Sequence, residues 1–262
     1  MTSRVDWVPG PYRGAMGEAT ITYVGHGTVL IERDGVRALT DPVLGERVLF
    51  LRREAPPPDL ERISEPDVVL VSHSHYDHLD VGSLRRVARA ATVVLPRGCG
   101  RYARRARVGS VIELEAGEGA DAAGLAVEAV HADHIGARRR FSRPLPSLGY
   151  VLPGSPSVYF AGDTDLYEEM SGLRGSVDVA LLPVAGWGPK VGVGHMDAER
   201  ATRAVELIRP DVVVPIHWGT LAAPRYRLPD LKAPAREFAE LVGRRAPETE
   251  VALLDPGESI EL

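Results

Sequence analysis

Short apolar runs separated by turns dominate the first part of the chain. Residues 20–24, 28–33 and 36–40 are rich in the β-branched side chains that favour strands. Asp34 and Gly35 separate the second run from the third, and Asp-Gly is typical of a tight β-hairpin turn. Residues 67–71 form a continuous apolar run, which predicts a buried strand.

Helical spacing of apolar residues alternates with these runs farther along the chain. The residues that share one face of the segment 197–208 are Ala201, Ala204, Val205 and Ile208, and Asp197 precedes them as a plausible N-cap. Helices are predicted over residues 81–90, 98–106, 197–208 and 231–245. Further strands are predicted over residues 92–95, 110–114, 125–130, 147–152, 157–161, 177–182, 212–216 and 250–254.

The order of these elements predicts an α/β (α+β) fold in which two mixed sheets stack face to face with helices outside. The polar segment 44–65 contains three consecutive prolines and is predicted as a loop, over the surface or beside a site. The chain has 262 residues, of which 44% are hydrophobic, so we expect one domain over residues 1–262 with a sizeable core.

Composition narrows the classes of partner. A net charge of -5 argues against general binding to nucleic acid or to an anionic membrane, although a local basic site stays open. The single cysteine cannot form an internal disulfide. The first ten residues lack the apolar core of a signal peptide, and no apolar run approaches the roughly 20 residues of a membrane span. We therefore expect a cytoplasmic protein that acts on a small molecule, with an anionic substrate and a homo-oligomer both left open.

The densest group of metal-ligating side chains follows the strand at residues 67–71. His73, His75, Asp77 and His78 stand there in an H-x-H-x-D-H pattern, in a turn between a predicted strand and a predicted helix. Such turns place side chains in the crevice where ligands of α/β proteins bind. Imidazole and carboxylate suit zinc, iron or manganese, so the pattern predicts a metal site rather than a solvated loop.

This pattern resembles the signature of the metallo-β-lactamase superfamily, and further pieces of that signature occur in the expected order between about residues 20 and 220. These pieces are Thr40-Asp41-Pro42, His134, Gly162-Asp163-Thr164 and Pro215-Ile216-His217-Trp218-Gly219-Thr220. The segments that are similar to one branch, which contains ascorbate-6-phosphate lactonase and N-acyl-phosphatidylethanolamine-hydrolysing phospholipase D, are Gly25-His26-Gly27-Thr28, Phe160-Ala161-Gly162-Asp163-Thr164, Gly194-His195-Met196 and the His217 segment. The resemblance implies a four-layer αββα sandwich, the metallo-β-lactamase fold.

The resemblance also implies two divalent metal ions, zinc in the first place, with manganese or iron as alternatives. The first ion would be held by His73, His75 and His134, the second by Asp77, His78 and His217, and Asp163 would bridge them. His131 competes with His134 as the ligand that follows strand 125–130, and only the family match favours His134. Asp163 could instead stabilise its own turn, because Asp commonly bonds to nearby backbone.

Other residues have supporting or alternative roles. Asp41 is expected to orient a ligand histidine through its second ring nitrogen. His26, between two glycines, is interpreted as a packed structural residue more readily than as a ligand. His195 follows a glycine-rich loop and could position the substrate or protonate a leaving group, or it could only cap the helix that follows.

Two further predictions concern substrate binding. Trp187 is a candidate for a wall of the substrate pocket. Arg143 could reach a substrate carboxylate or phosphate, because the planar guanidinium matches two oxygens. It belongs to a cluster with Arg138, Arg139 and Arg140, whereas the cluster of Arg101, Arg104, Arg105 and Arg107 is interpreted as a solvated face.

The leading functional hypothesis is a dinuclear metal-dependent hydrolase. Two ions about 3.5–4 Å apart can share a hydroxide that attacks a small ester, lactone, amide or phosphodiester, with Asp77 and His195 as catalytic residues. A non-haem iron oxidoreductase on the same fold is the alternative, although the diiron electron-transfer members of the family typically carry Glu at the place of His75. A binding protein without turnover is a third hypothesis, which the complete ligand set disfavours.

Overall fold

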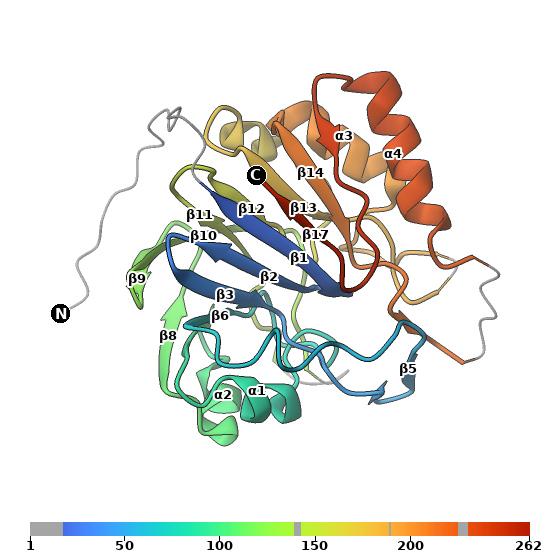
Figure 1. Cartoon of the computed structure of the whole chain (residues 1–262). Helices are drawn as coiled ribbons and strands as arrows, with labels where there is room; N and C mark the ends of the chain where they lie inside the picture. The colour runs from blue at the N-terminus through green and yellow to red at the C-terminus, as the bar shows by residue number, and fades with distance from the viewer. Residues whose placement is uncertain (1–17, 139–142, 189, 225–229) are drawn as a thin grey trace.

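Two seven-stranded sheets lie face to face, with helices on both outer sides (Figure 1). The computed structural model describes residues 18–138, 143–188, 190–224 and 230–262. The first sheet has the order β17-β1-β2-β3-β6-β7-β8 and the second the order β16-β14-β13-β12-β11-β10-β9. The strands of the first sheet are β1 (Ala19–Gly25), β2 (Thr28–Arg33), β3 (Val36–Thr40), β6 (Val68–Leu70), β7 (Thr92–Pro96), β8 (Ser110–Leu114) and β17 (Ser259–Glu261).

Both sheets are mixed, as predicted. The strands of the second sheet are β9 (Gly119–Ala122), β10 (Leu125–His131), β11 (Leu148–Leu152), β12 (Val158–Phe160), β13 (Val179–Pro183), β14 (Val212–Ile216) and β16 (Glu250–Val251). The successive strands β1-β2-β3 and β9-β10-β11-β12 pair antiparallel, whereas β3-β6-β7-β8 and β12-β13-β14-β16 pair in parallel. The parallel strands β6 and β12 both lead with their carboxyl ends into the loops that carry the metal-ligating side chains.

Successive side chains of a strand point to opposite faces of the sheet, and both faces of the inner strands are covered, which explains why their apolar runs are continuous. Val29 and Ile31 of β2 point into the core between the two sheets, while Leu30 points outward into a second core beneath helices. Val68 and Leu70 of β6 face the inner core in the same way. Because both faces of these strands are covered, almost every position is apolar.

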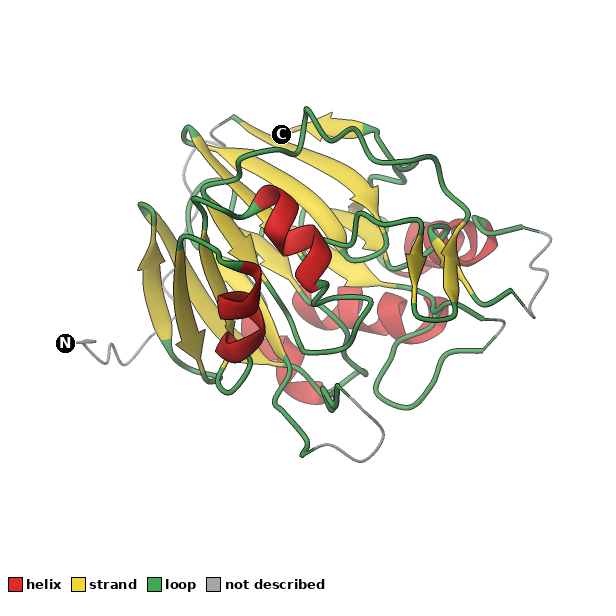
Figure 2. Ribbon diagram, turned by 90° about the horizontal axis from the view of Figure 1, so that it is seen from below, coloured by secondary structure: helices red, strands yellow, loops and turns green. Residues whose placement is uncertain are grey.

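Helices cover the two outer faces and complete the four-layer sandwich (Figures 1 and 2). The helices are α1 (Val81–Val87), α2 (Gly100–Ala106), α3 (Ala198–Ile208), α4 (Ala233–Arg245) and a 3-10 helix, η1 (Glu168–Leu173). The first two pack on the first sheet, and α3 and α4 pack on the second. Asp197 caps α3 as predicted, since its side chain accepts a hydrogen bond from the backbone N–H of Arg200.

Several predicted elements were wrong in extent. The helix predicted over residues 81–90 ends at Val87, and the strand predicted over residues 250–254 pairs only at Glu250–Val251. Strands β9 and β17 and the helix η1 were not predicted. The segment 44–65 is not only a loop, because β4 (Arg47–Val48) and β5 (Leu51–Arg53) form a hairpin in it, which pairs with β15 (Leu221–Ala222).

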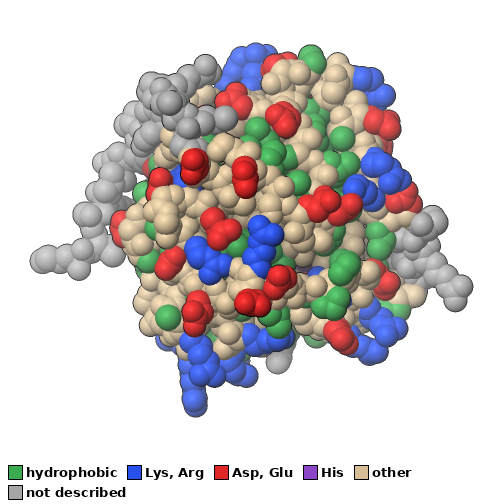
Figure 3. All heavy atoms as spheres, viewed as in Figure 1, with side chains coloured by type: hydrophobic (Ala, Val, Ile, Leu, Met, Phe, Trp, Pro, Cys, Tyr) green, Lys and Arg blue, Asp and Glu red, His purple; other side chains and the backbone are tan. Residues whose placement is uncertain are grey.

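The surface is electrostatically mixed. On the face drawn in Figure 3, acidic and basic side chains are interspersed. Among the described residues, no helix combines the length and the apolar character that a membrane crossing requires. The expectation of one domain over residues 1–262 stays a prediction.

Candidate metal centre

Three imidazoles converge beyond the carboxyl ends of β6 and β10. His73 and His75 lie in the turn that follows β6, and His134 lies in the loop that follows β10. The Nδ1 atom of His75 is 2.9 Å from Nε2 of His73 and 3.1 Å from Nε2 of His134. Three ring nitrogens at these separations can ligate one ion.

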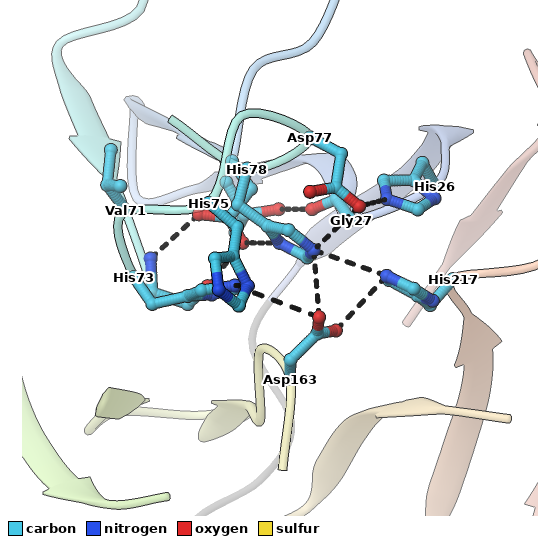
Figure 4. Close-up of polar contacts among 12 residues, drawn as sticks. His26, Gly27, Val71, His73, His75, Asp77, His78, Asp163 and His217 are labelled. Atoms are coloured by element: carbon cyan, nitrogen blue, oxygen red, sulfur yellow. Dashed lines mark hydrogen bonds and ion pairs between the residues drawn. The ribbon is translucent and has the colours of Figure 1, made fainter. Parts of the chain in front are cut away.

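A second group of nitrogens and oxygens lies beside the first (Figure 4). The Nε2 atoms of His78 and His217 are 3.2 Å apart, and His217 follows β14. One carboxylate oxygen of Asp77 is 3.9 Å from Nε2 of His78 and 3.2 Å from Nε2 of His26. The ring of His26 in turn packs on that of His217, with 3.9 Å between ring centroids.

Asp163 stands between the two groups. Its carboxylate oxygens lie 3.1 Å from Nε2 of His78, 3.1 Å from Nε2 of His217 and 3.8 Å from Nε2 of His73. Gly162 makes this position possible, because its φ is +60° and a Cβ atom there would lie only 2.4 Å from Cβ of Ser72. The glycine therefore allows the loop after β12 to approach the turn after β6.

The outer nitrogen of four imidazoles is held by an identified acceptor. Nδ1 of His78 donates to Asp41 Oδ2, Nδ1 of His217 donates to the carbonyl of Ala185, and Nδ1 of His134 donates to the carbonyl of Gly194, at 2.6, 2.8 and 2.8 Å. Nδ1 of His73 donates to Ser72 Oγ at 2.9 Å, because the Ser72 hydroxyl gives its own proton to Asp41. These acceptors assign the tautomers and place a lone pair on each Nε2.

When these four rings are neutral, their Nε2 lone pairs face one another and a carboxylate, which is unfavourable unless a cation or a proton lies among them. Asp163 Oδ1 supports the same conclusion, because it is buried and lacks a hydrogen-bond donor within the described part of the chain. The donor set thus fits divalent metal ions.

The electrostatics of the cluster favour the ligating forms. Burial lowers the pKa of His75 to about 4 and that of His217 to about 3, so both rings are neutral at neutral pH. Burial would raise the pKa of Asp163, but His217, His78 and His195 hold it well below its usual range. Metal ions bind neutral imidazoles and ionised carboxylates.

His78 and His195 are different. Burial favours the neutral form of each ring, but Asp163 raises the pKa of both, and Asp41 adds to the effect at His78. A cation bound at Nε2 of His78 would replace the proton that this raised pKa favours there. His195 lies 3.2 Å from Asp163 through Nε2, and its side chain is 20% exposed.

The structure brings together all seven residues predicted as metal ligands, which are His73, His75, Asp77, His78, His134, Asp163 and His217. It separates the two competing histidines, because His131 is exposed and packs on Tyr167, whereas His134 is in the cluster. Asp41 contacts His78, one of the histidines predicted as ligands. The interpretation of His26 as a packed residue rather than a ligand stays a prediction. Its ring is buried and contacts Asp77, and it lies with Asp77, His78 and His217 in a group whose ligand atoms could hold one metal ion.

The predicted substrate-binding residues fall in different places. Trp187 and His195 line a cavity of about 240 Å³ that opens beside Asp163. Arg143 is exposed and does not line that cavity, which Arg138 does. Arg139 and Arg140 lie outside the described residues.

Sequence reasoning missed two parts of the site. The backbone acceptors Ala185 and Gly194 left no signal, because any residue type supplies a carbonyl. The β4–β5 hairpin lines the cavity through residues 48–51. The run of four apolar residues at positions 48–51, in a largely polar segment, was the available signal.

Comparisons with known proteins agree with this architecture. A family model described as "Beta-lactamase superfamily domain" matches residues 36–218. A metal-dependent hydrolase of Methanopyrus kandleri is 34% identical over 250 residues, which cover 92% of this chain and 99% of that protein. This chain therefore belongs to the metallo-β-lactamase superfamily of metal-dependent hydrolases.

More distant similarities extend over most of the chain. A metallo hydrolase from Ignicoccus hospitalis has a similar structure, with a TM-score of 0.70, 26% identity and coverage of 94% of this chain and 98% of that one. N-acyl-phosphatidylethanolamine-hydrolyzing phospholipase D 1 of Caenorhabditis elegans is 28% identical, over 90% of this chain and 74% of that protein. Longer relatives also exist: an uncharacterized protein of Mycobacterium tuberculosis is 33% identical, and the alignment covers only 62% of its length.

Proposed function

We propose that the protein is a dinuclear metal-dependent hydrolase of a small ester, lactone, amide or phosphodiester, with zinc as the metal and manganese or iron as alternatives. The observation that carries this proposal is the convergence of the Nε2 atoms of His73, His78 and His217 on the buried carboxylate of Asp163. His73, His75 and His134 would hold one ion, and Asp77, His78 and His217 the other. Asp163 contacts both groups and is suited to bridge them.

Two ions in this centre would supply a water of lowered pKa and a Lewis acid for the scissile carbonyl or phosphoryl group. The chain supplies the remaining functions. His26 holds Asp77 in place through Nε2. His195 lines the cavity and has a raised pKa, so it can hold a proton beside Asp163 and give it to the leaving group.

The test combines metal content with turnover. Purified protein is analysed for zinc, manganese and iron and assayed on a panel of lactones, esters and phosphodiesters, before and after treatment with a chelator. We expect two metal equivalents per chain, loss of turnover on chelation and recovery when metal is restored. His75→Ala should lose metal and activity, whereas His131→Ala, which changes an exposed histidine outside the cluster, should keep both.

Two results would contradict the proposal. Equal turnover by His75→Ala and the unchanged protein would remove the catalytic centre from the cluster. An iron-loaded protein that consumes oxygen and hydrolyses no member of the panel would favour the oxidoreductase alternative. Hydrolysis of phosphodiesters alone would narrow the substrate class toward that named for the nematode relative.

A further inference from the structure

One wall of the cavity beside Asp163 is apolar, and the opposite side is the candidate metal centre. We define the hairpin wall as Val48, Leu49, Phe50 and Leu51 together with Trp187 and Tyr76. The polar side consists of His75, Asp77, Asp163 and His195, with Arg138 beside them. A molecule in this cavity would therefore contact hydrocarbon on one side and the metal-ligating groups on the other.

The hairpin wall is held in place by its own small core. Val48 and Leu51 are buried in a cluster with Val43, Leu221 and Ala223, against which Tyr76 and Trp187 pack. Strand β5 pairs with β15, which begins four residues after His217. Because the wall is attached to the same segment as a candidate ligand, its distance from the metal centre is set by the fold.

Two aromatic side chains of the hairpin wall are fixed by further contacts. The Arg138 guanidinium lies 4.0 Å from the centroid of the Tyr76 ring and donates hydrogen bonds to the carbonyls of Ser74 and Leu79. The N–H of Ala223 donates to the carbonyl of Trp187. A wall that is ordered before binding loses little conformational entropy when a ligand packs on it.

The tip of the hairpin has unusual exposure. Leu49 is 66% exposed and Phe50 is 55% exposed, although both line the cavity. Phe50 packs edge-on against Trp187, with 5.4 Å between ring centroids. Leu49 has a φ of +53°, a conformation that bulky side chains rarely adopt. Apolar surface in a strained turn over a polar centre indicates that a ligand covers it.

The volume of the cavity decides the size of that ligand. At about 240 Å³, the cavity exceeds the roughly 150 Å³ of an engineered cavity that binds benzene, and it is smaller than the sites of drug-sized molecules, which begin near 300 Å³. One ring or one short branched chain fits.

A second cavity adjoins this one. It has a volume of about 280 Å³, shares Trp187 and His195 with the first, and is lined otherwise by Gly186, Gly188, Lys190, Val191 and Gly192. His195 therefore stands between the two cavities. A leaving group can then occupy the second cavity while the apolar group stays against the hairpin wall.

We propose, building on the function above, that the substrate carries an apolar group of about the size of one aromatic ring next to its scissile bond, and that the hairpin wall binds this group. Phe50 and Trp187 are then the residues that determine specificity. They contact the substrate and are not metal ligands.

The experiment measures binding, so that it does not depend on turnover. Acetate and phenylacetate share a carboxylate that can bind at the metal centre, and they differ by a phenyl ring. Calorimetric titration of the metal-loaded protein should show phenylacetate binding roughly tenfold or more tightly, because burial of a ring contributes more than about 1.4 kcal/mol. Phe50→Ala should reduce this ratio about threefold or more, whereas Leu60→Ala, a partly exposed leucine outside the cavity, should leave it unchanged.

Three outcomes would overturn the proposal. Equal binding of the two carboxylates would remove the apolar subsite, and an unchanged ratio in Phe50→Ala would remove Phe50 from it. Association of the protein with phosphatidylcholine or phosphatidylglycerol vesicles, lost in Phe50→Ala, would make the hairpin tip a membrane contact instead. Failure of the hydrolase proposal has a different signature, because phenylacetate would then bind preferentially while the panel stays unhydrolysed.

Discussion

Asp41→Asn removes the negative charge of the carboxylate that contacts His78 in the candidate metal centre, and it changes little else. The Asp41 carboxylate is fully buried and accepts three hydrogen bonds, from the backbone N–H of Ser72 at 2.7 Å, from Ser72 Oγ at 2.5 Å and from His78 Nδ1 at 2.6 Å. Asparagine has the same shape but offers one oxygen and one amide NH₂. That amide must therefore face at least one donor.

The magnitude follows from these contacts. A hydrogen bond to a charged group contributes about 1.5–3 kcal/mol, so we expect the free energy of unfolding of the metal-free protein to fall by about 2 kcal/mol. Loss of the acceptor that orients His78 should also weaken metal binding about 10- to 100-fold. Because Asp41 contacts His78 directly, the ion proposed to bind with Asp77 and His217 should be released first.

The first assay is competition with a chelator, in which the amount of metal released is measured at each chelator concentration. The second is urea unfolding of the metal-free protein. Asp34→Asn is the matched control, because the Asp34 side chain is 74% exposed in a hairpin turn at a φ of +54°, which asparagine also adopts. Ser72→Ala tests the same network from the other side, since the Ser72 hydroxyl joins Asp41 to His73. A release curve for Asp41→Asn that superimposes on that of the unchanged protein would refute the reasoning.

Two further predictions concern the stability of the scaffold. Burial would raise the pKa of Glu113, but hydrogen bonds from the backbone N–H groups of Gly100 and Gly98 lower it overall. The ionised carboxylate therefore stabilises the fold at pH values above its unfolded pKa of about 4.3. This stabilisation is lost as the pH falls through the folded pKa. Urea titrations should find Glu113→Gln less stable by about 1 kcal/mol at pH 7, with the difference vanishing in acid, and a difference independent of pH would contradict the linkage. Gly162→Ala should lower the free energy of unfolding by about 2 kcal/mol or more, because its Cβ would overlap Ser72, whereas Gly175→Ala, also at positive φ but with open space, should cost only about 1 kcal/mol. Equal losses in the two alanine variants would show that the contact with Ser72 is unimportant.

The inner strands of the first sheet were predictable because packing on both faces leaves a strong pattern. The predicted bounds of β2 and β3 match the observed ones, since apolar side chains on either face leave no ambiguity about where the strand ends. Strands β9 and β17 lie at sheet edges and contain few apolar residues, so they left no such pattern. The β4–β5 hairpin was missed because its pairing with β15 is long-range and its neighbourhood is rich in proline.

Some residues of the candidate metal centre could be predicted from local spacing alone, and others could not. The spacing of His73, His75 and His78 indicated a metal by itself, because the chemistry lies within one turn of chain. The assignment of His134 over His131 needed the family resemblance, and the structure distinguishes them by burial and by the carbonyl of Gly194. The carbonyls that accept hydrogen bonds from the Nδ1 atoms of His134 and His217 belong to distant segments of the chain. No local sequence pattern indicates which carbonyl will meet which histidine.

The hairpin at residues 47–53 supplies much of the cavity wall and none of the groups that would hold metal. Diversification of its tip, for instance by a library randomised at two or three positions, would therefore alter selectivity while leaving the chemical machinery intact. A lineage built on this scaffold can acquire new preferences through a few substitutions in one short hairpin.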